Sequence, residues 1–214
     1  MREDIASIRN EYTSAELDET SVAKNPVSQF EKWFHEALSS EQIEPTAMTL
    51  ATVDLNGQPF QRTVLLKTFN ENGFVFYTNY KSRKADHMSN NPKVSLLFPW
   101  YSLERQVIVT GQVEKISAKE SLKYFITRPR GSQIGAWVSN QSEVITSRSI
   151  LNMKLAEMKK KFKDGKIPLP DHWGGFRVIP DSIEFWQGRA NRLHDRIMYE
   201  KDSNHNWGIK RLAP

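Results

Sequence analysis

Hydrophobic residues recur at two different spacings along this chain of 214 residues. After Pro26 the spacing is helical and one face is apolar, so the pattern predicts a helix that packs on a core. This face is formed by Phe30, Trp33, Phe34, Ala37 and Leu38. The run from Ser28 to Glu31 is typical of a capping box, which predicts that the helix begins there.

The rest of the chain carries short runs of β-branched and aromatic residues separated by turn residues, a pattern typical of strands. The predicted strands span residues 47–54, 59–67, 73–79, 93–100, 105–116, 174–179, 182–186, 196–200 and 207–212. Asn56-Gly57 between the first two runs predicts a tight hairpin. Because the strands do not alternate regularly with helices, they favour an antiparallel sheet or barrel over a parallel sheet.

Two further helices interrupt the predicted strands. A capping box at Ser117 to Glu120 begins one of them, and the other spans residues 149–162. Its inward side chains are predicted to be Ile150, Leu151, Leu155, Met158 and Phe162. Residues 1–25 are polar and charged, a composition typical of a mobile leader, but they contain a motif-like cluster at residues 9–12, and we expect partial order there. A single domain is predicted over residues 26–214.

Composition narrows the classes of protein that fit. The chain has 38% hydrophobic residues and no apolar run near the length that spans a bilayer, which predicts a globular, cytoplasmic protein without membrane contact. It has no cysteine, so redox chemistry requires a cofactor, and its five histidines show no metal-ligand spacing. The formal charge of +5 suits an anionic partner without specifying which.

Small cationic groups are the candidate chemistry. In the strand predicted at residues 62–67, Arg62 and Lys67 point to opposite faces, and a charged edge strand is the favoured interpretation of this segment alone. Residues 77–88 are predicted to leave a strand and begin a helix, where backbone N–H groups would attract an anion beside Arg83 and Lys84. A solvated helix start is the alternative.

Two later groups also suggest anion binding. Tyr124, Arg128 and Ser132 are spaced four apart; the first two would share a helix face, and Pro129 would end the helix and place Ser132 in a loop. They could hold a phosphate dianion, and an arginine that caps the helix end is an equal alternative. Residues 186–196 combine a Trp, three Arg and His194, which could transfer protons near neutral pH, although such a histidine is more often structural.

Taken together, these segments resemble the pyridoxine/pyridoxamine 5′-phosphate oxidase family from about Arg9 to Pro214. The most specific segments are residues 62–67, 94–100, 104–107, 132–139, 185–188 and 192–196. The resemblance implies a predominantly β fold with flanking helices, an FMN-binding split β-barrel. It also implies a homodimer that binds FMN at the subunit interface.

The resemblance assigns roles to individual residues. The implied FMN contacts are Arg62, Thr63, Val64, Leu65, Leu66, Lys67, Tyr77, Thr78, Arg83, Lys84, Gln106, Gln141, Ser142, Trp186 and Arg196. The implied substrate contacts are Arg9, Tyr12, Lys67, Tyr124, Arg128, Ser132, Arg192 and His194. Arg192 and His194 are the implied catalytic pair beside the pyridine ring, whereas Arg9 and Tyr12 would cover the pocket.

The implied reaction converts pyridoxine or pyridoxamine 5′-phosphate to pyridoxal 5′-phosphate, with O2 as electron acceptor and release of H2O2, and of ammonia from the amine. One alternative is a protein of this fold that binds FMN or carries pyridoxal phosphate without oxidase turnover. The oxidase is favoured because a protein that binds flavin alone needs no second phosphate site, and this chain has the joint set of Lys67, Tyr124, Arg128, Ser132, Arg192 and His194. A nucleic-acid-binding module, suggested by the sequence pI of about 9.3, ranks well below both, so no nucleic acid partner is expected.

Overall fold

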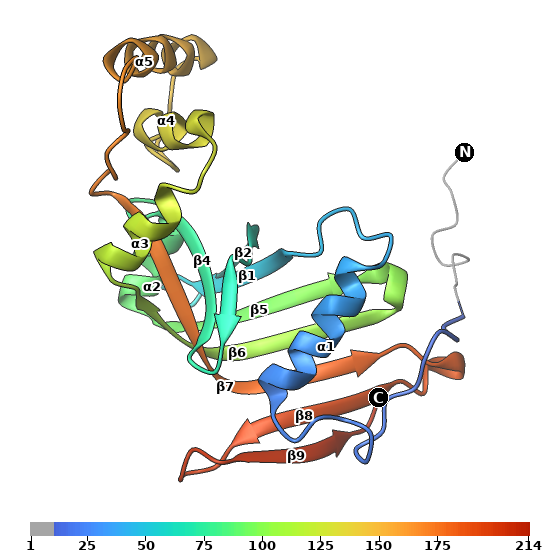
Figure 1. Cartoon of the computed structure of the whole chain (residues 1–214). Coiled ribbons are helices and arrows are strands. Elements are labelled where there is room, and N and C mark those ends of the chain that lie inside the picture. The colour runs from blue at the N-terminus through green and yellow to red at the C-terminus, as the bar shows by residue number, and fades with distance from the viewer. Residues whose placement is uncertain (1–10) are drawn as a thin grey trace, which may run out of the picture. The chain divides into compact units, whose positions relative to one another are not determined.

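The computed structural model describes residues 11–214, which form a strand-rich fold with flanking helices (Figure 1). The α-helices within this range are α1 (Pro26–Leu38), α2 (Arg83–Asn90), α3 (Ala118–Phe125), α4 (Arg130–Val138) and α5 (Arg148–Lys161). The strands are β1 (Ala47–Val53), β2 (Pro59–Leu65), β3 (Thr68–Asn70), β4 (Gly73–Asn79), β5 (Lys93–Trp100), β6 (Arg105–Lys115), β7 (Trp173–Gln187), β8 (Asp195–Lys201) and β9 (Trp207–Leu212). Over the same residues, no helix combines the length and apolar character needed to cross a membrane.

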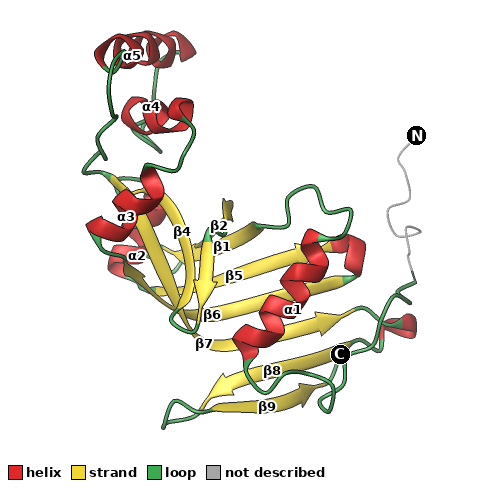
Figure 2. Cartoon of the chain, viewed as in Figure 1, coloured by secondary structure: helices red, strands yellow, loops and turns green. Residues whose placement is uncertain are grey.

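The strands belong to one sheet, in the order β2-β1-β5-β6-β7-β4-β3, and β8 and β9 extend it from β7 (Figure 2). The described residues divide into two compact units. The first unit comprises residues 11–50, 95–110 and 180–214, and the second comprises residues 51–94 and 111–179. Four strands, β1, β5, β6 and β7, contribute residues to both units. The single-domain organisation expected for residues 26–214 stays a prediction.

In the first unit, α1 lies across one face of the strands (Figure 1). The Asn25 side chain caps this helix by accepting hydrogen bonds from the N–H groups of Val27 and Ser28, so the capping box predicted at Ser28 is wrong. Phe30 and Trp33 are buried as predicted and contact aromatic rings of β5 and β7. Leu38, by contrast, is exposed, because the apolar stripe ends one residue earlier at Ala37.

In the second unit, β4 is buried along most of its length and pairs antiparallel with β3 and β7. The predicted capping box at the start of α3 is confirmed, since the Ser117 hydroxyl and the Glu120 carboxylate each accept a backbone N–H of the other residue. Helices α4 and α5 pack against each other (Figure 1). The predicted inward face of α5 is half-buried against the cluster that contains Phe125, Phe162 and Trp173.

Two local predictions were wrong because of proline. Residues 174–179 and 182–186 form one strand, β7. Pro180 lies between the residues that pair with β4 and those that pair with β8, so its missing N–H interrupts neither set of hydrogen bonds. Pro129 does not leave a loop behind it. It precedes α4 as its N-cap residue, which places Ser132 on a helix, while α3 ends at Phe125 and leaves Arg128 outside it. The short strand β3 was also not predicted.

Candidate functional site

A cavity of about 550 Å³ lies within the second unit, a volume typical of small-molecule sites. Strands β2 and β4, the start of α2, the end of α3 and the loop after α4 contribute its walls. The lining residues are Phe60, Gln61, Arg62, Thr63, Val64, Leu65, Lys67, Tyr77, Thr78, Arg83, Lys84, Tyr124, Arg128, Gln141, Ser142 and Trp173. The structure therefore brings most of the predicted cofactor residues to one place, although Leu66 is buried and does not line the cavity.

The charge of this cavity is strongly one-sided. Its described lining contains five basic side chains and no Asp or Glu. Burial, and then the nearby charge of Arg62, lowers the pKa of Lys84 to about 8. Burial, and then Arg83, lowers the pKa of Arg62 as well. Arg62, Arg83 and Lys84 are thus close enough to influence one another, and we call them the basic triad. An anion bound among them would relieve their repulsion.

Neutral oxygens surround the ammonium group of Lys84. Its Nζ donates hydrogen bonds to Thr78 Oγ1 at 3.2 Å and to Gln141 Oε1 at 3.0 Å. Ser142 approaches the same helix start, because its Oγ accepts the backbone N–H of Arg83 at 3.2 Å. The loop after α4 thus reaches the N-terminus of α2. The predicted helix start lies within the cavity wall, with Ser82 as an N-cap that forms no side-chain cap.

A second candidate element for anion binding is built on aromatic rings. Tyr77 stacks on Tyr124 with ring centroids 4.0 Å apart and on Trp173 at 5.3 Å. The Arg128 guanidinium lies 4.6 Å from the centre of the Trp173 ring. Its Nη1 is buried and has no hydrogen-bond partner within the described residues. Arg128 therefore presents a donor that a bound anion could satisfy.

Burial also affects the titration of this second element. It lowers the pKa of Arg128 and raises that of Tyr77 to about 12. Ser132 lies beside it in the first turn of α4 and lines a neighbouring cavity of about 350 Å³, to which Arg128 also contributes. The predicted trio of Tyr124, Arg128 and Ser132 is thus shared between two adjoining cavities rather than placed in one.

The predicted catalytic residues lie in the first unit. The rings of Tyr12, Trp186 and His194 form a cluster, with centroids 4.6 Å apart for Trp186 and His194 and about 6 Å for each pair that includes Tyr12. His194 Nδ1 accepts the backbone N–H of Arg189 at 3.1 Å, so neutral His194 carries its proton on Nε2. Arg192 is exposed, with a left-handed backbone at φ +60°.

Other predicted residues are placed differently. Arg196 already binds the carboxylate of Glu184 through two nitrogens, at 2.8 and 3.1 Å, and this pairing raises its pKa. Gln106 is half-buried on β6 of the first unit. Arg9 lies outside the described residues.

Three residues of the cavity lining were not predicted from the sequence: Phe60, Gln61 and Trp173. For Trp173, the available signal was its position before Gly174 and Gly175. A Cβ at Gly174 would lie 2.1 Å from Tyr80 Oη, and one at Gly175 would lie 2.9 Å from Tyr77 Cε1. Glycines that admit aromatic rings this closely indicate that the start of β7 is packed with aromatic side chains.

Two family models match the chain. The model described as "Pyridoxamine 5′-phosphate oxidase" matches residues 34–162. The model described as "Pyridoxine 5′-phosphate oxidase C-terminal dimerisation region" matches residues 173–214. Together they include both the cavity and the residues around His194.

Curated relatives match over nearly the whole chain. The pyridoxine/pyridoxamine 5′-phosphate oxidase of Pectobacterium atrosepticum is 56% identical over 99% of this chain and 92% of its own length. That of Aliarcobacter butzleri is 54% identical over 99% of this chain and 100% of its own length.

Among solved structures, PhzG from Burkholderia lata, in complex with tetrahydrophenazine-1-carboxylic acid, has a TM-score of 0.88 at 26% identity, over 94% of this chain and 100% of that protein. An FMN-binding protein from Nostoc punctiforme, related to pyridoxamine 5′-phosphate oxidase, has a TM-score of 0.73 at 17% identity, over 91% of this chain and 99% of that protein, and shows similarity of fold.

Proposed function

The chain belongs to the pyridoxamine 5′-phosphate oxidase family, and we propose that it oxidises pyridoxine or pyridoxamine 5′-phosphate to pyridoxal 5′-phosphate with FMN as cofactor. Molecular oxygen is the final electron acceptor, which gives H2O2, and ammonia leaves when the substrate is the amine. Curated relatives that share more than half of its residues over nearly their full length support this proposal.

The observation that carries the proposal is the buried, unpartnered Nη1 of Arg128 in a cavity whose described lining has no carboxylate. A buried guanidinium without a partner is costly, so a site that keeps one gains when an anion binds there. The basic triad forms a further group of cations in the same cavity. A flavin phosphate and a substrate phosphate together require two such groups.

The residues of the cavity fit FMN. We assign the flavin phosphate to the basic triad, where the Gln141 amide and the Ser142 hydroxyl add neutral polar groups. Residues 62–65 of β2 and Lys67, just after the strand, line the cavity beside them, whereas Leu66 does not. When bound, FMN would supply the two-electron redox chemistry that this cysteine-free chain lacks, with O2 as the final oxidant.

The protein's own contribution is to bind and orient the substrate. Arg128 holds the 5′-phosphate by charge-assisted hydrogen bonds, with the hydroxyls of Tyr124 and Ser132 as additional donors and Lys67 at the cavity wall. Arg192 and His194 orient the pyridine ring, and Arg192 assists removal of the proton from the 4′ substituent. Fixing C4′ in a reactive geometry is the main source of rate acceleration that these residues offer.

We also propose that the protein works in the cytoplasm as a homodimer with FMN at the subunit interface. The C-terminal match to a dimerisation region supports the dimer. This region contains Trp186 and Arg196, both implied FMN contacts, whereas the cavity belongs to the second unit.

The visible spectrum of the purified protein tests the proposed function. A flavin spectrum that pyridoxine 5′-phosphate bleaches without air, and that oxygen restores with release of H2O2, is the expected result. A flavin spectrum unchanged by either substrate would instead identify an FMN-binding protein without this oxidase activity. Absence of a flavin spectrum after incubation with FMN would overturn the cofactor assignment.

A further inference from the structure

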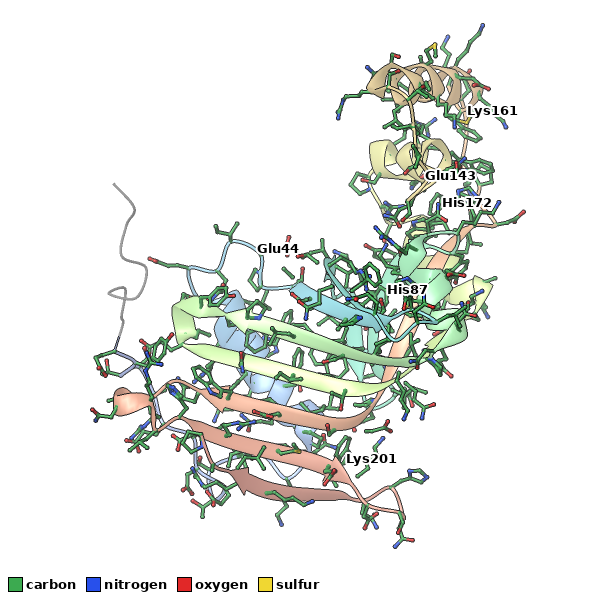
Figure 3. The ribbon with its side chains drawn as sticks, turned by 180° about the vertical axis from the view of Figure 1, so that it is seen from behind. Glu44, His87, Glu143, Lys161, His172 and Lys201 are labelled. Atoms are coloured by element: carbon green, nitrogen blue, oxygen red, sulfur yellow. The ribbon has the colours of Figure 1, made fainter. Side chains whose placement is uncertain are left out.

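A buried histidine lies behind the basic triad and plays no part in the proposed reaction. His87 comes from α2 (Figure 3). It is only 4% exposed. Its Nδ1 lies 3.0 Å from the hydroxyl of Thr52, a residue of β1 that is 1% exposed. The same hydroxyl oxygen accepts a hydrogen bond from Arg62 Nη1 at 2.6 Å. These contacts join three elements, because Arg62 belongs to β2.

The available protons fix the direction of the first hydrogen bond. A guanidinium can only donate, so the Thr52 oxygen accepts from Arg62. The direction of the second bond depends on the tautomer of His87. When the ring proton is on Nε2, the Thr52 hydroxyl donates to Nδ1, and donors and acceptors alternate from Arg62 through Thr52 to His87.

A ring contact links His87 to another member of the triad. The Phe60 ring lies 4.9 Å from the His87 ring, and the Arg83 guanidinium lies 5.2 Å from the Phe60 centre. Phe60 and both arginines line the cavity, whereas Thr52 and His87 do not. The two buried polar residues thus contact the binding surface only through other side chains.

We propose that Thr52 and His87 are positioning residues that hold the Arg62 guanidinium in the orientation that receives the cofactor phosphate. The inference rests on the proposed FMN site. An arginine side chain loses considerable rotamer freedom when it binds an anion, and a guanidinium that is already held by a buried hydroxyl loses less. The bidentate geometry of an Arg–phosphate contact makes this orientation important.

Two substitutions at Thr52 separate the hydrogen bond from the packing. Thr52→Val keeps the shape and removes the hydroxyl, whereas Thr52→Ser keeps the hydroxyl. Titration of the apoprotein with FMN, followed by quenching of flavin fluorescence, is expected to show binding weakened roughly tenfold by Thr52→Val and nearly unchanged by Thr52→Ser. Riboflavin, which lacks the phosphate, serves as the matched ligand, and its affinity should change in neither variant.

Substitutions at His87 test the next contact in the same way. His87→Asn can place an acceptor near the position of Nδ1, whereas His87→Phe keeps an aromatic ring against Phe60 without an acceptor. We expect His87→Phe to weaken FMN binding severalfold and His87→Asn to restore most of it. In an Arg62→Met background, His87→Phe should cause no further loss of FMN affinity, because its effect passes through Arg62.

Each outcome decides between positioning and simple packing. Wild-type FMN affinity in Thr52→Val would overturn the proposal. Equal weakening of FMN and riboflavin, together with a lower Tm of the apoprotein, would also overturn it, since this indicates a general structural role. Additive effects of His87→Phe and Arg62→Met would exclude the path through Arg62. Failure of the wild-type protein to bind FMN would instead remove the proposed function itself.

Discussion

Replacement of Arg128 by alanine tests the proposed substrate site most directly. The variant removes a guanidinium that stacks on Trp173 and whose Nη1 has no partner in the described residues. A hydrogen bond to a charged group contributes about 1.5–3 kcal/mol, which corresponds to a factor of roughly 10–150 in binding. We therefore expect kcat/KM for pyridoxine 5′-phosphate to fall by about one to two orders of magnitude, mainly through a higher KM.

The stability of the free protein should respond differently. Loss of the cation–π contact with Trp173 costs roughly 0.5–2 kcal/mol, but removal of a buried unpaired donor relieves a penalty of similar size. The Tm of Arg128→Ala apoprotein should consequently stay close to that of the wild type. A strong loss of substrate affinity without a loss of stability distinguishes a ligand-binding arginine from a structural one.

The assay compares two substrates in two proteins. Peroxide release is measured with pyridoxine 5′-phosphate and with unphosphorylated pyridoxine. If Arg128 binds the phosphate, Arg128→Ala lowers kcat/KM for pyridoxine 5′-phosphate but not for pyridoxine. The preference for the phosphorylated substrate then falls by the same factor. Arg148→Ala is the matched control, because Arg148 is exposed at the start of α5 and does not line the cavity. A wild-type KM in Arg128→Ala would refute this reasoning.

Three further predictions follow from the same geometry. A bound phosphate favours the charged form of Lys84, whose pKa is about 8 in the free protein, so FMN affinity should fall as the pH rises through about 8. Fluorescence titration across this pH range measures the affinity. Arg192→Ala and His194→Ala should each lower kcat/KM in steady-state assays at least tenfold while FMN stays bound. Gly188→Ala should displace Tyr12, since the new Cβ at position 188 would lie 2.8 Å from Tyr12 Cγ. Limited proteolysis should then cleave the segment near Tyr12 faster than in the wild type.

Each of these predictions has its own control. Lys84→Arg should flatten the pH dependence of FMN binding, and a pH dependence that persists in this variant would exclude Lys84 as its source. Wild-type kcat/KM in both the Arg192 and His194 variants would remove them from the reaction. Gly131→Ala is the control for Gly188→Ala, because a Cβ there meets no atom within 4 Å, and equal proteolysis of the two variants would contradict the proposed clash.

Much of the fold could be predicted because it depends on local patterns. Strands β4, β5 and β9 have the predicted bounds, and the capping box of α3 forms as expected. The relatives of solved structure confirm the predicted split-barrel class. One error reflects strand pairing that the local pattern does not contain. Pro180 lies within a strand because neither β4 nor β8 requires its missing N–H. Two other errors are local: Asn25 rather than Ser28 caps α1, and Pro129 precedes a helix.

The candidate site could be predicted only in part, and mainly through resemblance. Local pattern indicated that Arg83 and Lys84 begin a helix, which the structure confirms. It could not indicate that Gln141 contacts Lys84 across 57 positions of sequence. Nor could it indicate that Trp173 supports Arg128, since neither spacing nor composition reports a contact between a guanidinium and an indole ring that are distant in the sequence. The individual site roles stay predictions until the variants are measured.

The partners of the basic residues separate two kinds of cation that look alike in the sequence. Arg105 pairs with Glu36, Arg196 with Glu184 and Arg211 with Asp195, so their charges are balanced within the folded chain. Lys84 contacts neutral oxygens, and Arg128 keeps a buried donor without a partner in the described residues.

A buried cation without a carboxylate partner, such as Lys84 or Arg128, lowers the stability of the free protein, and an anionic ligand restores that stability when it binds. Ligand concentrations about a hundredfold above Kd stabilise the folded state by about 2.7 kcal/mol, so saturating FMN should raise the Tm of the apoprotein by several degrees. Riboflavin at the same multiple of its own Kd gives the same increment by mass action. The contribution of the phosphate is therefore measured by the Kd of riboflavin divided by the Kd of FMN. This ratio should fall when Lys84 is replaced by methionine.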